Sequence, residues 1–431
     1  MRPVRIVHLG LGGFFRAHQA WYTGAAPDAE EWGIAAFTGR SRELADQLNT
    51  QDGRYTLIVR GPEHDEMAVQ RAVVAAHPGT DLTAWLDYLA RPQVAVVTLT
   101  VTEAAYRRNP DGGIDLDHPD VRADLAALRE GGGLRTVPGR LVAGLATRRA
   151  AGAGPLAVVS CDNLPGNGEV TRRVVAGLAA EADPELAGWI ADHVSFVTTM
   201  VDRITPRTTA DDVRAVAERT GWADAAPVVT EPFTEWVLSG EFPAGRPAWD
   251  GAGARFVDDV HPHETRKLLL LNGGHSLLAY AGSARGHETI AEAVADPVCR
   301  GWLEQWWDEA SHQVPLPAAE VDAYREALLD RFANPRIRHT LAQIAADGSQ
   351  KLPIRVLPVL RAERAAGRMP AGAVRILAAW IAHLRGAGAP VKDAGAGPYT
   401  ERAGSVRDVV ALLAPDLADD EALIAATGRE L

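Results

Sequence analysis

Three polar residues interrupt an apolar run in the second half of the chain: Lys267, Asn272 and His275, within KLLLLNGGH. If this segment is helical, about 100° per residue places Asn272 roughly 140° and His275 roughly 80° around the axis from Lys267, so the three share one side. Such groups, when buried, need partners or a cavity, and a cavity holding a lysine that can lose its proton suits acid–base chemistry. The alternative is a structural helix end, where the lysine reaches solvent and the histidine is hydrogen-bonded core.

A second pattern lies near the start of the chain, where the strand-like run VRIVHL leads directly into glycines. The turn comprises Gly10, Leu11, Gly12, Gly13, Phe14 and Phe15. Strand, glycine turn and helix in this order are the setting of a dinucleotide fingerprint, whose glycines permit the tight turn and the approach of a pyrophosphate. The third glycine of that fingerprint would fall at position 15, which is Phe15 here. The pattern predicts a nucleotide site with one departure from the usual residue set.

The elements that must position these residues change character along the chain. Strand-like runs occupy residues 4–9, 33–38, 54–60, 93–102, 155–161 and 195–201. Helical runs lie between several of them, which favours a parallel, doubly wound sheet with strands buried on both faces. Long Ala- and Leu-rich runs follow at 264–284, 286–311, 317–331, 334–346, 372–385 and 404–413. The sequence therefore predicts a Rossmann-type α/β domain, residues 1–258, and a mostly α-helical C-terminal domain, residues 259–431.

Composition limits the classes of partner. The chain has 431 residues and a net charge of -12, which argues against nucleic acid or an anionic membrane as its partner. Its two cysteines, Cys161 and Cys299, lack metal-type spacing and fit a reducing compartment. The chain enters a strand almost at once, and no apolar run approaches the roughly 20 residues of a membrane span. We expect a cytoplasmic protein with a small-molecule substrate, as a monomer or small homo-oligomer.

Histidines elsewhere are expected to have structural or surface roles. His261 and His263 have His-x-His spacing, but no third ligand stands at a recognisable distance, so we expect no metal. His18, in FFRAHQA, is expected to pack against the glycine turn.

Five ordered segments together resemble one enzyme family. They are GLGGFFRAHQAWYT at 10–23, SCDNLPGNG at 160–168, MVDRITPRTT at 200–209, TEPFTEWVLSGEFPAGRPAW at 230–249 and KLLLLNGGHSLLAYAG at 267–282. In this order they resemble the polyol-specific long-chain dehydrogenases, the mannitol dehydrogenase family, which includes mannitol 2-dehydrogenases and the fructuronate and tagaturonate reductases. The resemblance covers nearly the whole chain. The segment DGSQKLPIR at 347–355 is most similar to the fructuronate reductase branch.

The resemblance implies an NAD(P)-dependent reaction between a secondary alcohol of a linear polyol or aldonate and the ketose or ketouronate. Either D-mannonate and D-fructuronate or D-mannitol and D-fructose are the implied pairs. Lys267 would be the general base, without a metal, and burial beside a cationic cofactor ring should lower its pKa from the ordinary value of about 10.4. Asn163 and Asn272 would donate hydrogen bonds to the developing alkoxide, and His275 would bond the substrate oxygen. From its position alone, Asn163 could equally be a strand-end turn residue.

Four further residues are candidates for substrate contact. Asp202 and Arg203 end a strand-like run, and the resemblance implies that the aspartate approaches the substrate and tunes the lysine. The alternative is a structural ion pair. Lys351 and Arg355 could supply positive charge to the far end of a sugar acid, the alternative being a solvated loop.

The cofactor type depends on the end of the second strand, where NAD enzymes usually present an acid to the ribose. Here the run FTGRSR has no acid before Glu43, and Arg40 and Arg42 could accommodate a 2′-phosphate. The resemblance to the fructuronate reductase branch, which lacks this acid and uses NAD, implies NAD, so we favour NAD and leave NADP open. A non-catalytic dinucleotide-binding sensor is the alternative from another class, but a sensor has no need of the complete polar set around Lys267.

Overall fold

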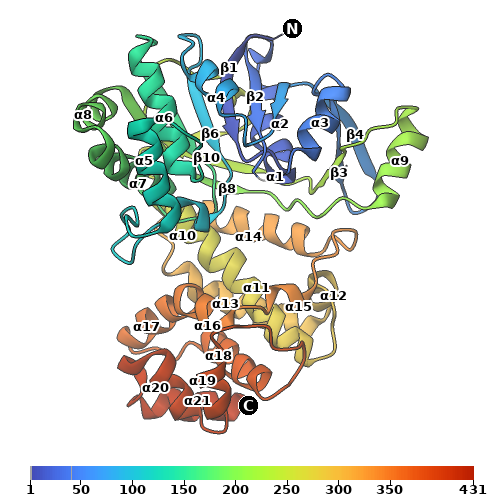
Figure 1. The fold of residues 1–431 in the computed structure, drawn as a ribbon. Helices are drawn as coiled ribbons and strands as arrows, with labels where there is room; N and C mark the ends of the chain where they lie inside the picture. The colour runs from blue at the N-terminus through green and yellow to red at the C-terminus, as the bar shows by residue number, and fades with distance from the viewer. Residues whose placement is uncertain (1, 40) are drawn as a thin grey trace. The chain divides into compact units, whose positions relative to one another are not determined.

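The structure, a computed structural model, describes residues 2–39 and 41–431. It forms two compact units, Met1–His261 and Pro262–Leu431 (Figure 1). Each unit buries its own hydrophobic residues. Arg40, expected to contact the cofactor, lies outside the described residues.

The first unit is built on an eight-stranded sheet with the order β11-β10-β8-β7-β6-β1-β2-β5. Its strands are β1 (Val4–Leu9), β2 (Gly33–Phe37), β5 (Val73–His77), β6 (Val96–Leu99), β7 (Leu156–Ser160), β8 (Val194–Asp202), β10 (Glu235–Ser239) and β11 (Arg255–Phe256). All neighbours from β8 to β5 are parallel, and β10 runs antiparallel to β8. The predicted Rossmann-type α/β class is confirmed.

Alternate residues of the central strands enter two separate cores, one on each face of this sheet. Ile6 of β1 packs with Phe15 in one core, whereas Val7 packs with Trp85 in the other. The helices of this unit are α1 (Gly13–Ala17), α2 (Gln19–Ala25), α3 (Glu43–Thr50), α4 (Leu82–Leu89), α5 (Pro119–Glu130), α6 (Val137–Ala150), α7 (Asn167–Ala182), α8 (Pro184–His193) and α9 (Ala210–Thr220). Burial on both faces explains the continuous apolar strands.

The sequence suggests that the strand-like run at 54–60 belongs to the main parallel sheet, but it does not. It forms β3 (Tyr55–Arg60) in a separate three-stranded sheet of order β4-β3-β9. β4 (Asp65–Gln70) pairs with it antiparallel and β9 (Val228–Thr230) parallel. The sequence prediction omitted β4 and β9 because one is polar and the other very short.

The second unit is mostly helical, as predicted. Its helices are α10 (His261–Arg266), which begins at the last residue of the first unit, then η4 (Lys267–Asn272), α11 (Gly273–Leu277), η5 (Leu278–Gly282), α12 (Ile290–Ala295), α13 (Pro297–Ser311), α14 (Ala318–Phe332), α15 (Leu341–Ile344), α16 (Gly348–Arg355), α17 (Leu357–Ala365), α18 (Ala371–Leu384), α19 (Gly397–Arg402), α20 (Val406–Leu413) and α21 (Glu421–Glu430). The elements η4 and η5 are π-helical turns.

One sequence prediction for this unit was wrong, and one alternative reading is excluded. The run 334–346 is helical only in α15, because Pro335 and an isolated β-bridge between Thr289 and Thr340 interrupt it. The solvated loop, which was the alternative reading for Lys351 and Arg355, does not apply, because Gly348–Arg355 forms α16, with Pro353 within the helix. Proline removes a single backbone donor, and the helix persists around it.

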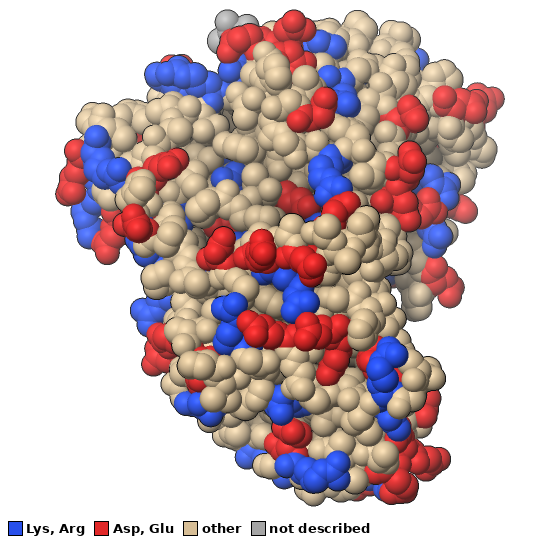
Figure 2. Space-filling view, turned by 180° about the vertical axis from the view of Figure 1, so that it is seen from behind, with Lys and Arg blue, Asp and Glu red and all other residues tan. Residues whose placement is uncertain are grey.

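Charged side chains and cysteines are present in both units. Lys and Arg side chains are interspersed with Asp and Glu on the face shown in Figure 2. Each unit contains one buried, free cysteine, Cys161 in the first and Cys299 in the second. Within the described residues, no helix is both long and apolar enough to cross a membrane.

Candidate functional site

The carboxyl ends of four neighbouring parallel strands carry the polar residues of the first unit. Gly10 follows β1, Thr100 follows β6, Asp162 follows β7, and Asp202 ends β8. Because these strands are parallel neighbours, their carboxyl ends share one edge of the sheet. In open α/β sheets this edge is where ligands bind.

The glycine turn is bound closely to the neighbouring strands. Gly10 has φ +114, and a Cβ there would lie 2.0 Å from the carbonyl oxygen of Thr100, so only glycine fits. The N–H groups of Gly10 and Leu11 both bond to the carbonyl oxygen of Phe37, at 2.9 and 2.8 Å. A Cβ on Gly12 would meet only ordinary contacts, at 3.6 Å, which leaves space beside the turn.

Phe15 replaces the third glycine of the fingerprint and has a packing role. Its ring is fully buried and stacks on His8 of β1, with centroids 3.5 Å apart. Burial lowers the pKa of His8 to about 3, so this ring pair is neutral. The predicted packing of His18 is also confirmed: it stacks on Phe14 at 5.0 Å, and its Nε2 lies 3.0 Å from the carbonyl oxygen of Glu235.

Asp162 ties together the loops that follow β6 and β7. Its Oδ1 accepts from the N–H groups of Val101 and Thr102, at 2.7 and 2.8 Å, and its Oδ2 accepts from the Tyr106 hydroxyl at 2.6 Å. Burial raises the pKa of Asp162, although these hydrogen bonds oppose the rise, and burial with the Asp162 charge raises the pKa of Tyr106. Thr102 has φ +77, a strained conformation of the kind found at functional sites.

Asn163 is exposed and lies between buried Asp162 and buried Leu164. Asn167 secures the far side of the loop: its Nδ2 donates to the carbonyl oxygens of Asp162 and Thr199, at 2.9 and 2.8 Å. The sequence prediction chose Asn163 and missed Asp162, although both stand in SCDNLPGNG. The Asn163 side chain is thus presented from a loop fixed on both sides.

Arg203 has the structural role that the sequence left open, but with backbone partners. Its guanidinium donates to the carbonyl oxygen of Ala17 at 2.5 Å and to that of Glu231 at 3.3 Å, and it lies over Trp21. Burial lowers the pKa of Arg203 to about 10. Asp202, the preceding residue, is also buried at the end of β8.

Near the end of β2, Arg42 forms an ion pair with Asp46, with Nε and Oδ2 2.9 Å apart. Both side chains are more than half exposed, so the pair contributes little to stability. Arg42 can therefore turn toward another anion at small cost.

In the second unit, Lys267 begins the π turn, Asn272 ends it, and His275 lies in α11. His275 is buried and is enclosed by two rings, with Phe332 stacked at 4.7 Å and His339 edge-on at 5.0 Å. Burial lowers the pKa of His339, and Arg331 adds to the fall. The buried Nδ1 of His339 has no hydrogen-bond partner among the described residues, which makes His339 a polar group that the sequence prediction missed.

Lys351 and Arg355 lie on α16, one turn apart. The Lys351 ammonium donates to the carbonyl oxygens of Ile344, at 3.1 Å, and Ala346, at 2.5 Å. Arg355 reaches Ser276 of α11, with Nη1 and Oγ 3.3 Å apart. Burial and the Arg355 charge lower the pKa of Lys351. Two of the three ammonium donors of Lys351 are thus committed to backbone.

Among the described residues, one grouping has ligand atoms close enough for a metal: His287, Asp296 and Cys299 offer atoms within 4.8 Å of one another. Arg285 already donates to Asp296 Oδ2 at 2.7 Å, and His287 Nε2 lies 3.0 Å from the same oxygen. Asp296 also caps α13. The contacts are those of a capped helix start with an ion pair.

Two family models match the chain: the mannitol dehydrogenase Rossmann domain over residues 4–251 and the mannitol dehydrogenase C-terminal domain over residues 259–412. The D-mannonate oxidoreductase of Escherichia coli (strain K12) is 41% identical over 367 residues, which are 83% of this chain and 75% of that protein.

Solved structures agree over the full length. The Pseudomonas fluorescens mannitol 2-dehydrogenase, in a ternary complex with NAD and D-mannitol, matches with a TM-score of 0.82 and 35% identity over 100% of this chain and 91% of the other. A D-sorbitol dehydrogenase in substrate-free form matches with a TM-score of 0.92 and 30% identity, over 99% and 92%. The chain belongs to the mannitol dehydrogenase family and is an oxidoreductase.

Proposed function

We propose that the chain is an NAD(P)-dependent dehydrogenase that interconverts a secondary alcohol of a linear polyol or aldonate with the ketose or ketouronate. D-mannonate with D-fructuronate and D-mannitol with D-fructose are the candidate pairs. Support comes from relatives and solved structures whose names refer to mannonate, mannitol and sorbitol. The observation that carries the proposal is the combination, in one chain, of a closely packed glycine turn with the set Lys267, Asn163, Asn272 and His275. A sensor without catalysis, the other class that we considered, would not require this set.

The first unit fits a dinucleotide. Gly10 has no room for a Cβ, whereas a Cβ at Gly12 or Gly13 would meet only ordinary contacts, at 3.6 and 3.5 Å. We assign cofactor binding to the turn residues 10–15, with Arg40, within a dinucleotide-binding domain of residues 1–258. When bound, NAD(P) supplies the hydride acceptor for oxidation and the hydride donor for reduction. We favour NAD, and Arg42 would contact the 2′-phosphate if NADP is the cofactor.

The catalytic domain, residues 259–431, supplies the proton chemistry. Lys267 takes the proton of the substrate hydroxyl during oxidation and returns it during reduction, so that no metal is required. Asn163 and Asn272 each donate an amide N–H to the oxygen as it gains negative charge. Neutral amides stabilise that charge without holding Lys267 in its protonated form. His275 bonds the same substrate oxygen.

The remaining candidates bind the rest of the substrate. Asp202 approaches the substrate, while Arg203 holds the end of β8 through its carbonyl contacts. Arg355 and the uncommitted donor of Lys351 are proposed to meet the far end of the substrate, where a sugar acid carries its carboxylate.

The test is a panel of D-fructuronate, D-tagaturonate, D-fructose and D-mannitol, each with NAD(H) and NADP(H), followed by nicotinamide absorbance. A kcat/KM for one polyol or ketouronate well above the others, dependent on Lys267, is expected. Absence of turnover with the entire panel, in protein that binds NADH, would favour the sensor.

A further inference from the structure

The segment that carries Lys267 has a different helical register from its neighbours. Residues Lys267–Asn272 form a π-helical turn between α10 and α11. The N–H of Gly273 bonds to the carbonyl oxygen of Leu268, the i→i+5 pairing of a π-helix. Such turns occur mostly as single bulges in α-helices and are frequent at functional sites.

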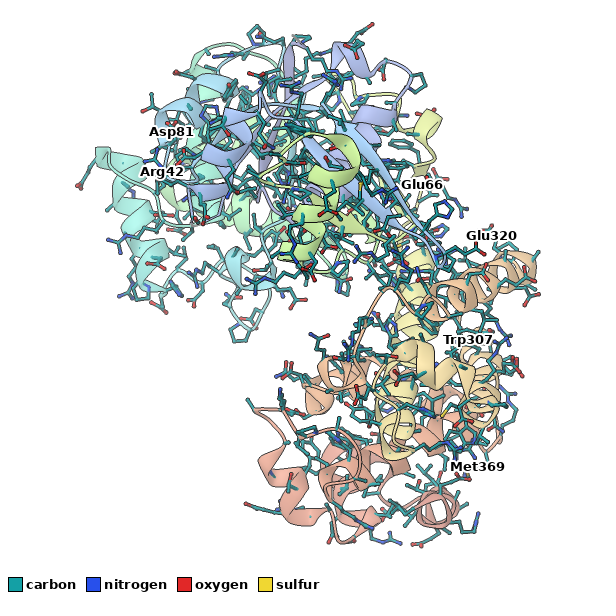
Figure 3. All side chains as sticks on the ribbon, turned by 90° about the vertical axis from the view of Figure 1, so that its right-hand side faces the viewer. Arg42, Glu66, Asp81, Trp307, Glu320 and Met369 are labelled. Atoms are coloured by element: carbon teal, nitrogen blue, oxygen red, sulfur yellow. The ribbon has the colours of Figure 1, made fainter. Side chains whose placement is uncertain are left out.

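Two tryptophans of α13 donate hydrogen bonds to this π turn. Trp306 Nε1 lies 3.0 Å from the carbonyl oxygen of Leu269, and Trp307 Nε1 lies 2.9 Å from that of Leu270. Both rings are buried, with 0% and 1% of the residue exposed; Trp307 is labelled in Figure 3. An indole N–H is a donor only, so each buried ring is held to one carbonyl of the turn.

The two glycines before His275 make this approach possible. A Cβ at Gly273 would lie 2.5 Å from Cζ2 of Trp306. A Cβ at Gly274 would lie 2.9 Å from Cδ1 of Leu303 and 3.2 Å from Nε1 of Trp307. The backbone and the indoles therefore pack at a distance that a larger residue would prevent.

We propose that Trp306 and Trp307 are positioning residues, whose N–H groups hold residues 267–272 in the π register and thereby fix Lys267 relative to Asn272. Replacing the π turn by an α turn removes one residue from the hydrogen-bonded ring and rotates Lys267 by about 100° relative to the residues that follow. Misplacement of about 1 Å can already cost on the order of 10²-fold in rate. This inference rests on the proposed role of Lys267.

The direct test is Trp307→Phe in the full chain, which keeps a buried ring and removes the N–H. We measure kcat and KM for D-mannonate and D-mannitol oxidation with NAD, the pH profile of kcat/KM, and the Kd of NADH. The expected result is a fall in kcat of about 10- to 100-fold with unchanged Kd for NADH. The apparent pKa of the acid limb should rise, because a displaced base is better solvated. Trp306→Phe should behave in the same way.

Two controls separate positioning from general stability. Trp302→Phe alters the same helix, but that ring lies against Arg285 and Arg375 and should leave the kinetics unchanged. Val410→Ala, a buried site in α20, should lower Tm without moving the pH profile.

A wild-type kcat and pH profile in Trp307→Phe would overturn the positioning role, as would an equal shift in Val410→Ala. Lys267→Ala distinguishes the two levels of the proposal. Retained turnover in Lys267→Ala refutes the base itself, whereas lost turnover there with normal Trp307→Phe refutes positioning alone.

Discussion

The two units hold their functional residues by different physical means. In the first, each residue comes from the end of a separate strand, and buried side chains such as Asp162 fix the loops that follow these strands. In the second, Lys267, Asn272 and His275 come from one continuous helix, whose register is set by contacts with α13. A lost loop contact should disturb one group, whereas a lost helix register displaces several together. We therefore expect that variants in the first unit disturb one functional group at a time, whereas variants that change the helix register in the second unit displace several groups together.

The largest expected effect is that of Lys267→Ala. Removing the proposed base should lower turnover by on the order of 10²–10⁴-fold, the usual contribution of general acid–base catalysis. The Kd of NADH should stay unchanged, since the glycine turn belongs to the first unit. Added methylamine should restore part of the rate. Near wild-type oxidation at neutral pH would remove Lys267 as the base.

Asn163→Ala and Asn272→Ala compare the two units directly. Each should slow turnover by about 10²–10³-fold if it donates to the developing alkoxide. The double variant should lose less than the sum of the two free-energy effects if both amides hold one oxygen. Steady-state kinetics and NADH titration are the measurements. Full activity in either single variant would make that asparagine a structural turn or helix residue.

Lys351→Met tests whether the second unit also determines the substrate. If its uncommitted donor meets a carboxylate, KM for D-fructuronate should rise about tenfold or more while KM for D-fructose hardly changes, because a hydrogen bond to a charged group is lost. Rising salt should weaken the binding of D-fructuronate but not that of D-fructose, because charges in contact with solvent are screened over about 8–10 Å. An equal rise in KM for both substrates would show that Lys351 only donates hydrogen bonds to the carbonyl oxygens of Ile344 and Ala346.

The smallest effect concerns stability in acid. Glu363 is 2% exposed, and hydrogen bonds from Arg368 and His312 hold its pKa at about 2. Because the folded value lies below the unfolded value of about 4.3, the contribution is complete above that pH and is lost as the pH falls toward 2. Its partners are half exposed, so we expect on the order of 1–2 kcal/mol.

Urea unfolding of Glu363→Gln between pH 6 and 3 measures this contribution. The variant should be less stable at pH 6 and should lose less stability on acidification than the wild type. Glu421→Gln, which breaks an exposed pair with Arg407, is the control and should change little. Parallel pH curves for Glu363→Gln and the wild type would contradict the assignment.

Local signals were sufficient for the strand and turn at residues 4–15, because periodicity and glycine conformation are encoded within a few residues. The same holds for the helical character of the second unit. Asp162 could not be assigned in this way, since its partners Val101 and Tyr106 lie 61 and 56 residues earlier in the chain. Residue type alone does not reveal which loop a carboxylate will hold.

The register of the Lys267 helix was mispredicted for a related reason. A uniform 100° per residue places Asn272 and His275 on one side, but the π turn changes that spacing. The register depends on donors from Trp306 and Trp307, 37 residues away. Residues 348–355 form a helix despite Pro353, so the solvated loop that the sequence left open as an alternative for Lys351 and Arg355 is excluded. Functional roles for these residues remain predictions.

Each unit has a single buried thiol, and the rate at which that thiol reacts reports how often the unit opens locally. Cys161 and Cys299 are 2% and 0% exposed, and burial raises the pKa of both thiols, that of Cys299 to about 11. Only thiolates react readily, so alkylation proceeds through molecules in which that unit has opened. Cys161 precedes Asp162 directly, and Cys299 lies on α13, which carries both positioning tryptophans. Mass spectrometry of alkylation at the two cysteines over time would therefore measure the rates of local opening at the sheet edge and at α13 independently, in one unmodified protein.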